Sequence, residues 1–226
     1  MTWRHLLFVH WPVEPACLSE YIPPPLKLDT WGGEAWLGVV PFQMENVRAR
    51  WLPPIAGQTR FPEINLRTYV RHAGRSGVYF FSLDIPRLLA TGIARLLWHL
   101  PYHRAKMSCE ATEGDWIEYE HHRPRRGGTP PATFRGRYRP TGPVALAESG
   151  SLAHFLTHRL CLFASGRRDR VWRGEIDHAP WPLQPAEMEL DHLDMTRLVG
   201  DPQSAGPPLL YYADRLDVHA WLPVRS

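Results

Sequence analysis

Four polar side chains follow one predicted strand at a spacing of two residues. In the segment FPEINLRTYV these are Glu63, Asn65, Arg67 and Tyr69. Because side chains alternate between the two faces of a strand, the four share one face. An acid, an amide, a guanidinium and a phenol in one row can orient a small carboxylate or carbonyl ligand. The pattern also fits a half-buried strand with one solvated face, and the sequence leaves both interpretations open.

A second candidate is Lys106, one of only two lysines among 26 basic residues. If PYHRAKMSC forms one strand, Tyr102, Arg104, Lys106 and Ser108 share a face. In a closed cavity, burial and the neighbouring Arg104 would favour a neutral amine, because both disfavour the ammonium form. A neutral amine can form a Schiff base with a ketone. If the face is solvated, Lys106 is an ordinary surface residue.

Other constellations point less clearly to chemistry. His154 and His158 lie four residues apart on a predicted helix, a spacing that can place two imidazoles on one metal ion, but no third ligand is evident. We favour a structural or surface role for the pair and expect neither a metal nor a cofactor. The basic runs at 121–128 and 166–173 do not indicate nucleic-acid binding, because the net charge is only +3 and no binding motif occurs.

The composition is that of an ordinary folded chain of 226 residues, with 44% hydrophobic and 22% charged residues. Three cysteines without a CxxC pair indicate reduced thiols rather than a disulfide framework or a cysteine zinc site. No segment has the features of a signal peptide, and the longest apolar stretch, 88–102, is too short to span a bilayer. We therefore expect a soluble, cytoplasmic protein with a single domain, residues 1–226.

The candidate residues must be positioned mainly by strands, because 23 prolines and 17 glycines fall between short apolar runs. Strands are predicted at 4–11, 28–31 and 34–49, twice within 61–84, and at 101–110, 115–122 and 133–139, with further strands near the end. The strands on either side of Gly32-Gly33 are expected to form a hairpin. Helices are predicted at 14–21, 86–99 and 150–160, the last with Ser151 as its N-cap. The expected fold class is α+β with mostly antiparallel strands.

Seven strings occur in an order and spacing that resemble the YqjF-like family of bacterial proteins of unknown function. They are FVHWPV, PPPLKLDTWGGEAWLGVVPFQM, FPEINLRTYV with GVYFFSLD, LPYHRAKM, FLTHRL, WRGEIDHAPWPLQPAE and YYADRLDVHAW. That family is placed in the acetoacetate decarboxylase-like superfamily. The resemblance covers nearly the whole chain, and it implies an open, cone-shaped β-barrel around a central cavity, with a few flanking helices.

The resemblance also implies roles for particular residues. In acetoacetate decarboxylase a lysine in the cavity forms a Schiff base with the β-keto acid, and glutamates and an arginine assist it. By motif position Lys106 is similar to that lysine, and Glu63 is similar to a glutamate of the preceding strand. The decarboxylase has two adjacent lysines after its glycine-aromatic-proline turn, whereas here His103, Arg104 and Ala105 precede Lys106.

These observations give one leading hypothesis and two alternatives. The leading hypothesis is a protein that binds or acts on a small keto acid, carboxylate or related carbonyl compound. Its expected catalytic residues are Lys106 and Glu63, and its expected ligand-binding residues are Arg67, Asn65, Tyr69, Arg104 and Tyr102. The alternatives are a non-catalytic binding protein using the same cavity, and a structural or interaction protein. No nucleic-acid or membrane partner is expected, and homo-oligomerisation stays open.

Overall fold

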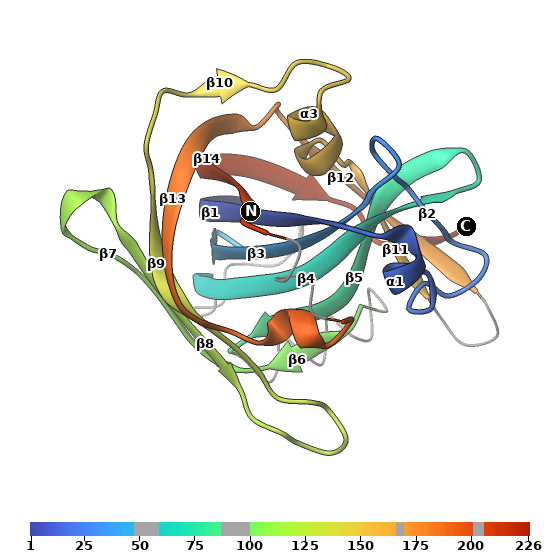
Figure 1. Ribbon diagram of the computed structural model, residues 1–226, viewed down its shortest axis with the longest axis horizontal. Coiled ribbons are helices and arrows are strands. Elements are labelled where there is room, and N and C mark those ends of the chain that lie inside the picture. Colours follow the sequence, from blue (N-terminus) through green and yellow to red (C-terminus); the bar gives the residue numbers. More distant parts are fainter. Residues whose placement is uncertain (48–58, 87–99, 166–169, 201–205) are drawn as a thin grey trace.

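Strands make up most of the chain in a computed structural model that describes residues 1–47, 59–86, 100–165, 170–200 and 206–226 (Figure 1). The strands are β1 (Thr2–Val13), β2 (Lys27–Leu28), β3 (Ala35–Glu45), β4 (Phe61–His72), β5 (Arg75–Ile85), β6 (Tyr102–Arg104), β7 (Lys106–Ala111), β8 (Ile117–Arg123), β9 (Ala132–Pro140), β10 (Ala145–Leu146), β11 (Cys161–Ser165), β12 (Val171–His178), β13 (Pro182–Leu193), β14 (Leu209–Ala220) and β15 (Val224–Arg225). The helices are α1 (Pro15–Ser19) and α3 (Leu152–Thr157), with 3₁₀ turns at Glu113–Asp115 and Met195–Arg197.

The central strands form a closed ring. Their order is β12-β11-β5-β4-β3-β1-β14, and a further pairing between β12 and β14 joins the two ends. All the pairs in this ring are antiparallel except β11 with β5. The ring places β4 between β3 and β5, so the row that begins at Glu63 lies on a central strand and not at an edge.

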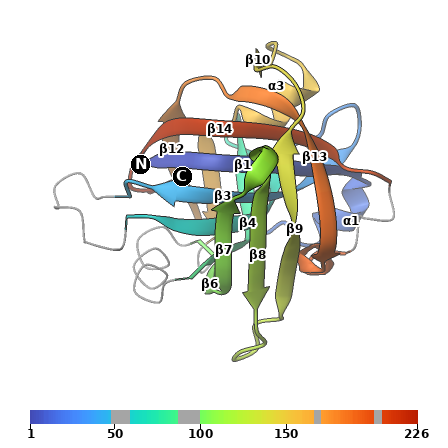
Figure 2. The same ribbon diagram turned by 90° about the vertical axis from the view of Figure 1, so that its left-hand side faces the viewer.

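A second layer of strands, β7-β8-β9-β13, extends from β14. Figure 2 shows β7, β8 and β9 crossing β1, β3 and β4 at a steep angle. The space between the layers is filled by a large apolar cluster that includes Leu37, Leu66, Tyr119 and Phe134, all of them fully buried. Burial of apolar surface on this scale is the main stabilising contribution to such a layered fold.

The opposite face of β1, β3 and β4 has its own core. Phe8, Val40 and Phe42 pack there with Trp181 and Leu183, and Ala153 of α3 packs against the same cluster. Both faces of the central strands are therefore buried. This is the reason that β3 is apolar at nearly every position and does not show the alternation of a half-exposed strand.

Most of the predicted elements are confirmed. The mostly antiparallel class, the hairpin within 61–84 and the helix capped by Ser151 all occur, and the Ser151 hydroxyl accepts a hydrogen bond from the amide of His154 at 3.2 Å. The predicted helix at 86–99 falls almost entirely outside the described residues. No helix in the described part of the chain is long and apolar enough to cross a membrane.

Two predictions about strand pairing are wrong. The segment 28–31 does not pair along 34–49 as a hairpin, because β2 pairs with β4 and only Trp31 bridges to Glu34. The segment 101–110 is not one strand, because it breaks at Ala105. Strand β6 before the break pairs in parallel with β5, whereas β7 after it pairs antiparallel with β8.

Candidate functional site

The polar row of β4 faces the interior. Glu63 and Asn65 are 5% and 4% exposed, Tyr69 is fully buried and Arg67 is partly buried. The apolar side chains of the same strand, such as Ile64 and Leu66, pack on the other face between the two layers. The alternation predicted from the sequence is therefore present, and a solvated face does not explain this row.

Among the described residues, no cation lies beside the carboxyl group of Glu63. Burial raises its pKa from 4.5 to about 8, and the nearby Asp84 adds to the increase. The Tyr102 hydroxyl donates to Oε2 of Glu63 over a long distance of 3.5 Å. The same burial, together with Glu63, raises the pKa of Tyr102 well above 10, so the phenol keeps its proton. At neutral pH the site therefore contains a protonated acid that can lose its proton at about pH 8.

A hydrogen bond from the second layer of strands holds the backbone at Glu63. Tyr119, which is fully buried on β8, donates its hydroxyl hydrogen to the main-chain oxygen of Glu63 at 2.8 Å. The contact satisfies a buried carbonyl group. It also ties this position of β4 to the second layer of strands.

The far end of the row contains a hydrogen-bond chain. The Tyr69 hydroxyl donates to the main-chain oxygen of Leu156 in α3 at 2.6 Å, and Nε2 of His10 lies 2.7 Å from the same hydroxyl. Since the single hydroxyl proton goes to Leu156, His10 must donate from Nε2. Burial and the nearby Arg67 lower the pKa of His10 well below 6.5, so the ring is neutral and its Nδ1 is an acceptor.

Gly38 makes room for this end of the site. A Cβ atom at Gly38 would lie 2.9 Å from the His10 ring and 3.4 Å from Cγ of Arg67. The Arg67 guanidinium carbon lies 5.4 Å from the centre of the Phe8 ring and 5.9 Å from that of Tyr69. Cation–π contacts of this kind hold the guanidinium against α3, where it also reaches the oxygen of Leu156 at 3.4 Å.

Three buried atoms of the site have no hydrogen-bond partner among the residues that the structure describes: Oδ1 of Asn65, Nε of Arg67 and Nδ1 of His10. Buried polar atoms are nearly always paired, so such atoms indicate a bound water or ligand. Glu63 and Tyr69 are six residues apart and thus separated by about 20 Å along the strand. A small ligand cannot touch both, and the positions that it can share are Glu63, Asn65 and Arg67.

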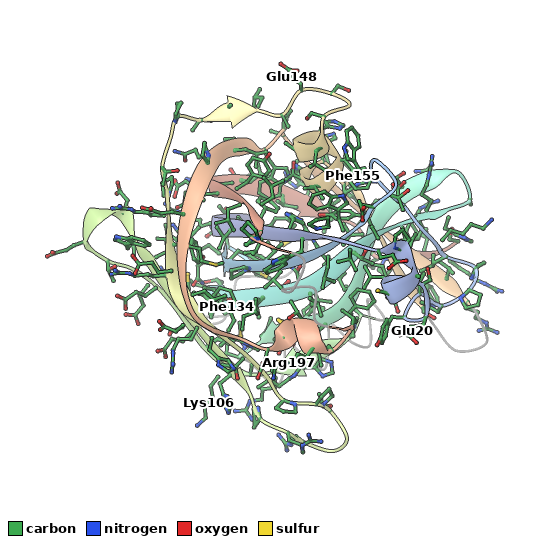
Figure 3. All side chains as sticks on the ribbon, viewed as in Figure 1. Glu20, Lys106, Phe134, Glu148, Phe155 and Arg197 are labelled. Atoms are coloured by element: carbon green, nitrogen blue, oxygen red, sulfur yellow. The ribbon has the colours of Figure 1, made fainter. Side chains whose placement is uncertain are left out.

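The structure does not bring Lys106 and Arg104 to this row. Both are exposed, and Figure 3 shows Lys106 pointing away from the molecule. The expectation of a shared wall with Tyr102 fails because the break at Ala105 ends the two-residue alternation. Tyr102 faces Glu63 from β6, whereas Lys106 begins β7 in the other layer. A covalent role for Lys106 stays a prediction that this position does not support.

His10 is the site residue that the sequence analysis missed. It continues the alternation of Leu6 and Phe8 along β1, so its face could have been predicted, but not its partner on β4. His158 gains a third histidine, His178, at 5.9 Å between ring centres. Even so, no group of three or more His, Cys, Asp or Glu residues among the described residues could hold a metal ion.

The whole chain has counterparts among known proteins. Residues 1–217 match the family model DUF2071, which is described as an uncharacterized conserved protein. The uncharacterized protein YqjF of Bacillus subtilis is 42% identical over 225 residues, which are 100% of this chain and 90% of that protein.

Several solved structures share the fold. An acetoacetate decarboxylase-like enzyme from Sphingomonas wittichii has a TM-score of 0.67 at 14% identity, covering 100% of this chain and 91% of that one. The enduracididine biosynthesis enzyme MppR, complexed with pyruvate, has a TM-score of 0.61 at 12% identity, covering 98% and 88%. Acetoacetate decarboxylase from Legionella pneumophila has a TM-score of 0.56 at 14% identity, covering 100% and 88%. At these identities the likeness shows the fold alone.

Proposed function

The chain belongs to the family of uncharacterized conserved proteins DUF2071, and we propose that it binds a small oxo acid on the inner face of β4, where Glu63 removes and returns a proton. The observation that carries the proposal is the buried Glu63 carboxyl, whose pKa is raised to about 8 and which has no neighbouring cation in the described part of the chain. Structural carboxyl groups are seldom buried in this way, whereas catalytic acids and bases often are. A base with a pKa near the working pH is well suited to proton transfer.

The proton would come from the carbon next to the ligand's carbonyl group. Ionised Glu63 takes that proton, the C–H bond breaks, and its electron pair passes to the carbonyl oxygen. The Tyr102 hydroxyl, which lies 3.5 Å from Glu63 in the resting site, is the donor available to the developing oxyanion. Return of the proton to the same carbon regenerates the carboxylate and the ligand.

Asn65 and Arg67 would hold the ligand. The unpartnered Nε of Arg67 supplies a charged donor for a carboxylate oxygen. The buried Asn65 amide has an unpartnered oxygen, and a half turn of the amide would present its NH₂ group instead. The choice of an oxo acid is supported by the chemistry of these groups. It also agrees with the pyruvate held by MppR, a protein of similar fold.

Proton exchange in deuterated buffer tests the proposal. Pyruvate and acetoacetate would be incubated with the protein, and loss of the exchangeable C–H signals would be followed by proton NMR. We expect C–H exchange to be faster with the wild-type chain than without protein, and the added rate to rise with pH through about 8. Glu63→Gln should abolish the added rate. The matched control is Glu118→Gln on β8, because Glu118 is exposed and should not matter.

The other hypotheses predict different results. If Lys106 forms a Schiff base, Lys106→Met abolishes exchange and borohydride traps an adduct on the wild-type chain only. If the protein only binds ligands, saturation-transfer NMR detects pyruvate but no exchange occurs. Absence of both binding and exchange for these two acids would overturn the proposal.

A further inference from the structure

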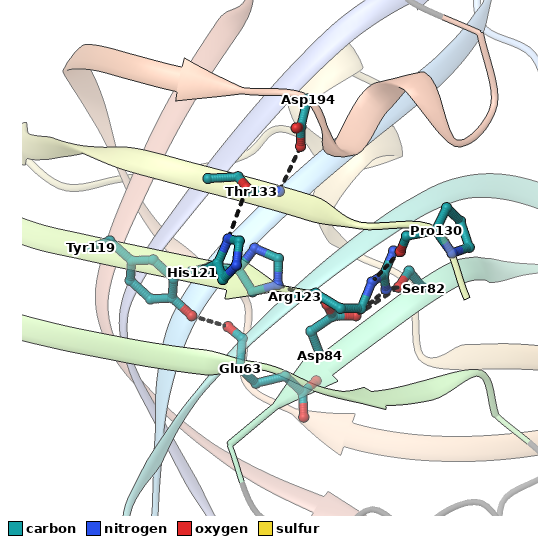
Figure 4. Close-up of polar contacts among 10 residues, drawn as sticks. Glu63, Ser82, Asp84, Tyr119, His121, Arg123, Pro130, Thr133 and Asp194 are labelled. Carbon is teal, nitrogen blue, oxygen red and sulfur yellow. Dashed lines mark hydrogen bonds and ion pairs between the residues drawn. The ribbon is translucent and has the colours of Figure 1, made fainter. Parts of the chain in front are cut away.

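A buried charged cluster lies on the opposite face of β5 from the Glu63 site. Asp84, His121 and Arg123 are 0%, 1% and 2% exposed. Nε2 of His121 lies 2.7 Å from one oxygen of Asp84, and Nη1 of Arg123 lies 2.7 Å from the other (Figure 4). Burial alone would raise the pKa of Asp84, but these two partners outweigh it and lower the pKa, so the carboxylate is ionised.

The sheet itself separates this cluster from the proposed active site. Along the β4–β5 pairing, Asp84 lies opposite Ile64 and Ser82 lies opposite Leu66. Paired residues share a face, so Asp84 and Ser82 point to the apolar side of β4, away from Glu63 and Asn65.

The cluster holds Arg123 in one orientation. Nη1 donates to both Asp84 and Ser82, and Nε donates to the main-chain oxygen of Pro130 at 3.0 Å. Within the described ranges, no hydrogen bond uses the remaining nitrogen, Nη2. A guanidinium fixed through two of its three nitrogens in this way keeps a charged donor available without further ordering.

Arg123 forms part of the lining of a cavity of about 420 Å³. Five of the other fourteen lining residues are Tyr or Phe, among them Tyr21, Tyr79, Phe81 and Phe163. The Phe81 ring packs edge to face against Tyr79, with 5.5 Å between ring centres. It packs in the same way against Tyr21, with 6.4 Å between ring centres. The lining also includes the polar side chains of Ser82, His103 and Ser165. A largely apolar and aromatic wall with a few placed polar groups is characteristic of small-molecule sites, in which the polar groups set the ligand's orientation.

We propose that this cavity is a second binding site, which takes a small planar carboxylic acid with an apolar body. The ring of the ligand would pack among Tyr79, Phe81 and Phe163, and one carboxylate oxygen would accept a hydrogen bond from Nη2 of Arg123. Glu63, Asn65 and Arg67 are not part of the cavity lining, and Arg123 is held by residues on the opposite face of β5, so we expect ligand binding here to be independent of the proton transfer at Glu63.

Fluorine NMR with 4-fluorobenzoate as the probe tests this site, and 4-fluorobenzyl alcohol is the matched neutral probe. We expect the wild-type chain to bind the benzoate at least about tenfold more tightly than the alcohol, which corresponds to one charge-assisted hydrogen bond. Ser165→Phe should block binding, because Ser165 lines the cavity and the larger side chain would fill it.

Tyr21→Ala should weaken binding at least about fivefold, since it removes one aromatic wall. Tyr21 is 38% exposed, so this variant should fold even if a cavity-filling variant does not. The matched control is Trp221→Ala, because Trp221 is 45% exposed and is not part of the cavity lining. Glu63→Gln should also leave benzoate binding unchanged, which separates this site from the proposed active site.

Three results would overturn the proposal. They are equal affinity for the acid and the alcohol, loss of binding in Trp221→Ala or Glu63→Gln, and absence of benzoate binding to the folded wild-type chain.

Discussion

At the scale of single residues, burial of Glu63 lowers the stability of the fold but gives its carboxyl group a pKa suited to proton transfer. A buried carboxyl group must stay protonated or carry an unpaired charge. In the folded chain only the Tyr102 hydroxyl contacts this carboxyl among the described side chains, and no cation compensates it. Natural proteins keep such a group when its function requires it, and replacing it is then expected to stabilise the fold.

Glu63→Gln should raise the free energy of unfolding, and the gain should grow with pH. The pKa of Glu63 rises from 4.5 in the unfolded chain to about 8 on folding. Between these values the folded state holds a proton that the unfolded state has lost, so stability falls as pH rises. The neutral amide avoids this loss, and we expect a gain on the order of 3 kcal/mol at pH 7.

Urea unfolding at pH 5, 7 and 9 measures this gain. Glu118→Gln, which removes an exposed carboxyl group, should change stability little at any of the three pH values. Equal stabilisation by Glu63→Gln at pH 5 and pH 9 would contradict the raised pKa of Glu63.

Position 38 needs a glycine because the His10 ring leaves no room for a side chain, and not because of an unusual backbone conformation. Gly38→Ala should destabilise the chain by about 1–3 kcal/mol, because the new methyl group would meet the His10 ring at 2.9 Å. A double-mutant cycle with His10→Ala tests the cause. We expect most of the cost of Gly38→Ala to disappear when the ring is absent, and an undiminished cost would show that His10 is not responsible.

At the scale of elements, α3 is held to the central ring through Tyr69. The helix has six residues, too few to be stable alone, so it depends on its contacts with neighbouring elements. The Tyr69 hydroxyl binds the oxygen of Leu156, and Trp181 donates from Nε1 to the oxygen of Thr157 at 2.8 Å. Both contacts satisfy carbonyl groups at the end of the helix, which have no partner within it.

Tyr69→Phe should therefore cost about 2 kcal/mol, because it leaves His10 without its partner and leaves the oxygen of Leu156 with only the long contact to Arg67. The mutation should speed amide hydrogen exchange more in α3 than in β4. The helix loses the hydrogen bond to Leu156, whereas β4 keeps its hydrogen bonds to β3 and β5. The control is Tyr211→Phe, whose hydroxyl has no hydrogen bond in the described part of the chain. Uniform faster exchange across both elements would argue against a local role for Tyr69.

At the scale of the whole molecule, several fully or partly buried histidines favour the neutral form. Burial is the main cause that lowers the pKa values of His10, His158 and His178 below 6.5. Below pH 6.5 these histidines bind protons in the unfolded chain but not in the folded chain, so the free energy of unfolding falls as the pH drops. Protonation of Glu63 has the opposite effect over the same range, which hides part of this loss.

The Glu63→Gln background separates the two effects. In that background we expect the midpoint of thermal unfolding to fall steadily between pH 7 and pH 5. Adding His10→Gln should reduce the slope, because the most deeply buried of the three imidazoles is then absent. A midpoint that does not change over this range would contradict the neutral buried histidines.

The sequence by itself determined the local features of this protein. Alternation along 61–70 gave the polar face of β4, and Ser151 gave the start of α3, because each depends only on residues close in the chain. The ordered strings also indicated the fold class through their resemblance to a known family. Of the predicted site residues, Glu63, Asn65, Arg67 and Tyr69 do lie on one buried face.

Only the tertiary structure decided which of these residues meet. Tyr102 reaches Glu63 and Lys106 does not, because the chain leaves one layer for the other at Ala105 and the alternation does not survive that change. His10, His121 and Arg123 gained their roles from partners 37 to 59 residues away. Local patterns fix the face of a side chain, but burial and pairing between distant strands fix its neighbours, and the chemistry of a site depends on those neighbours.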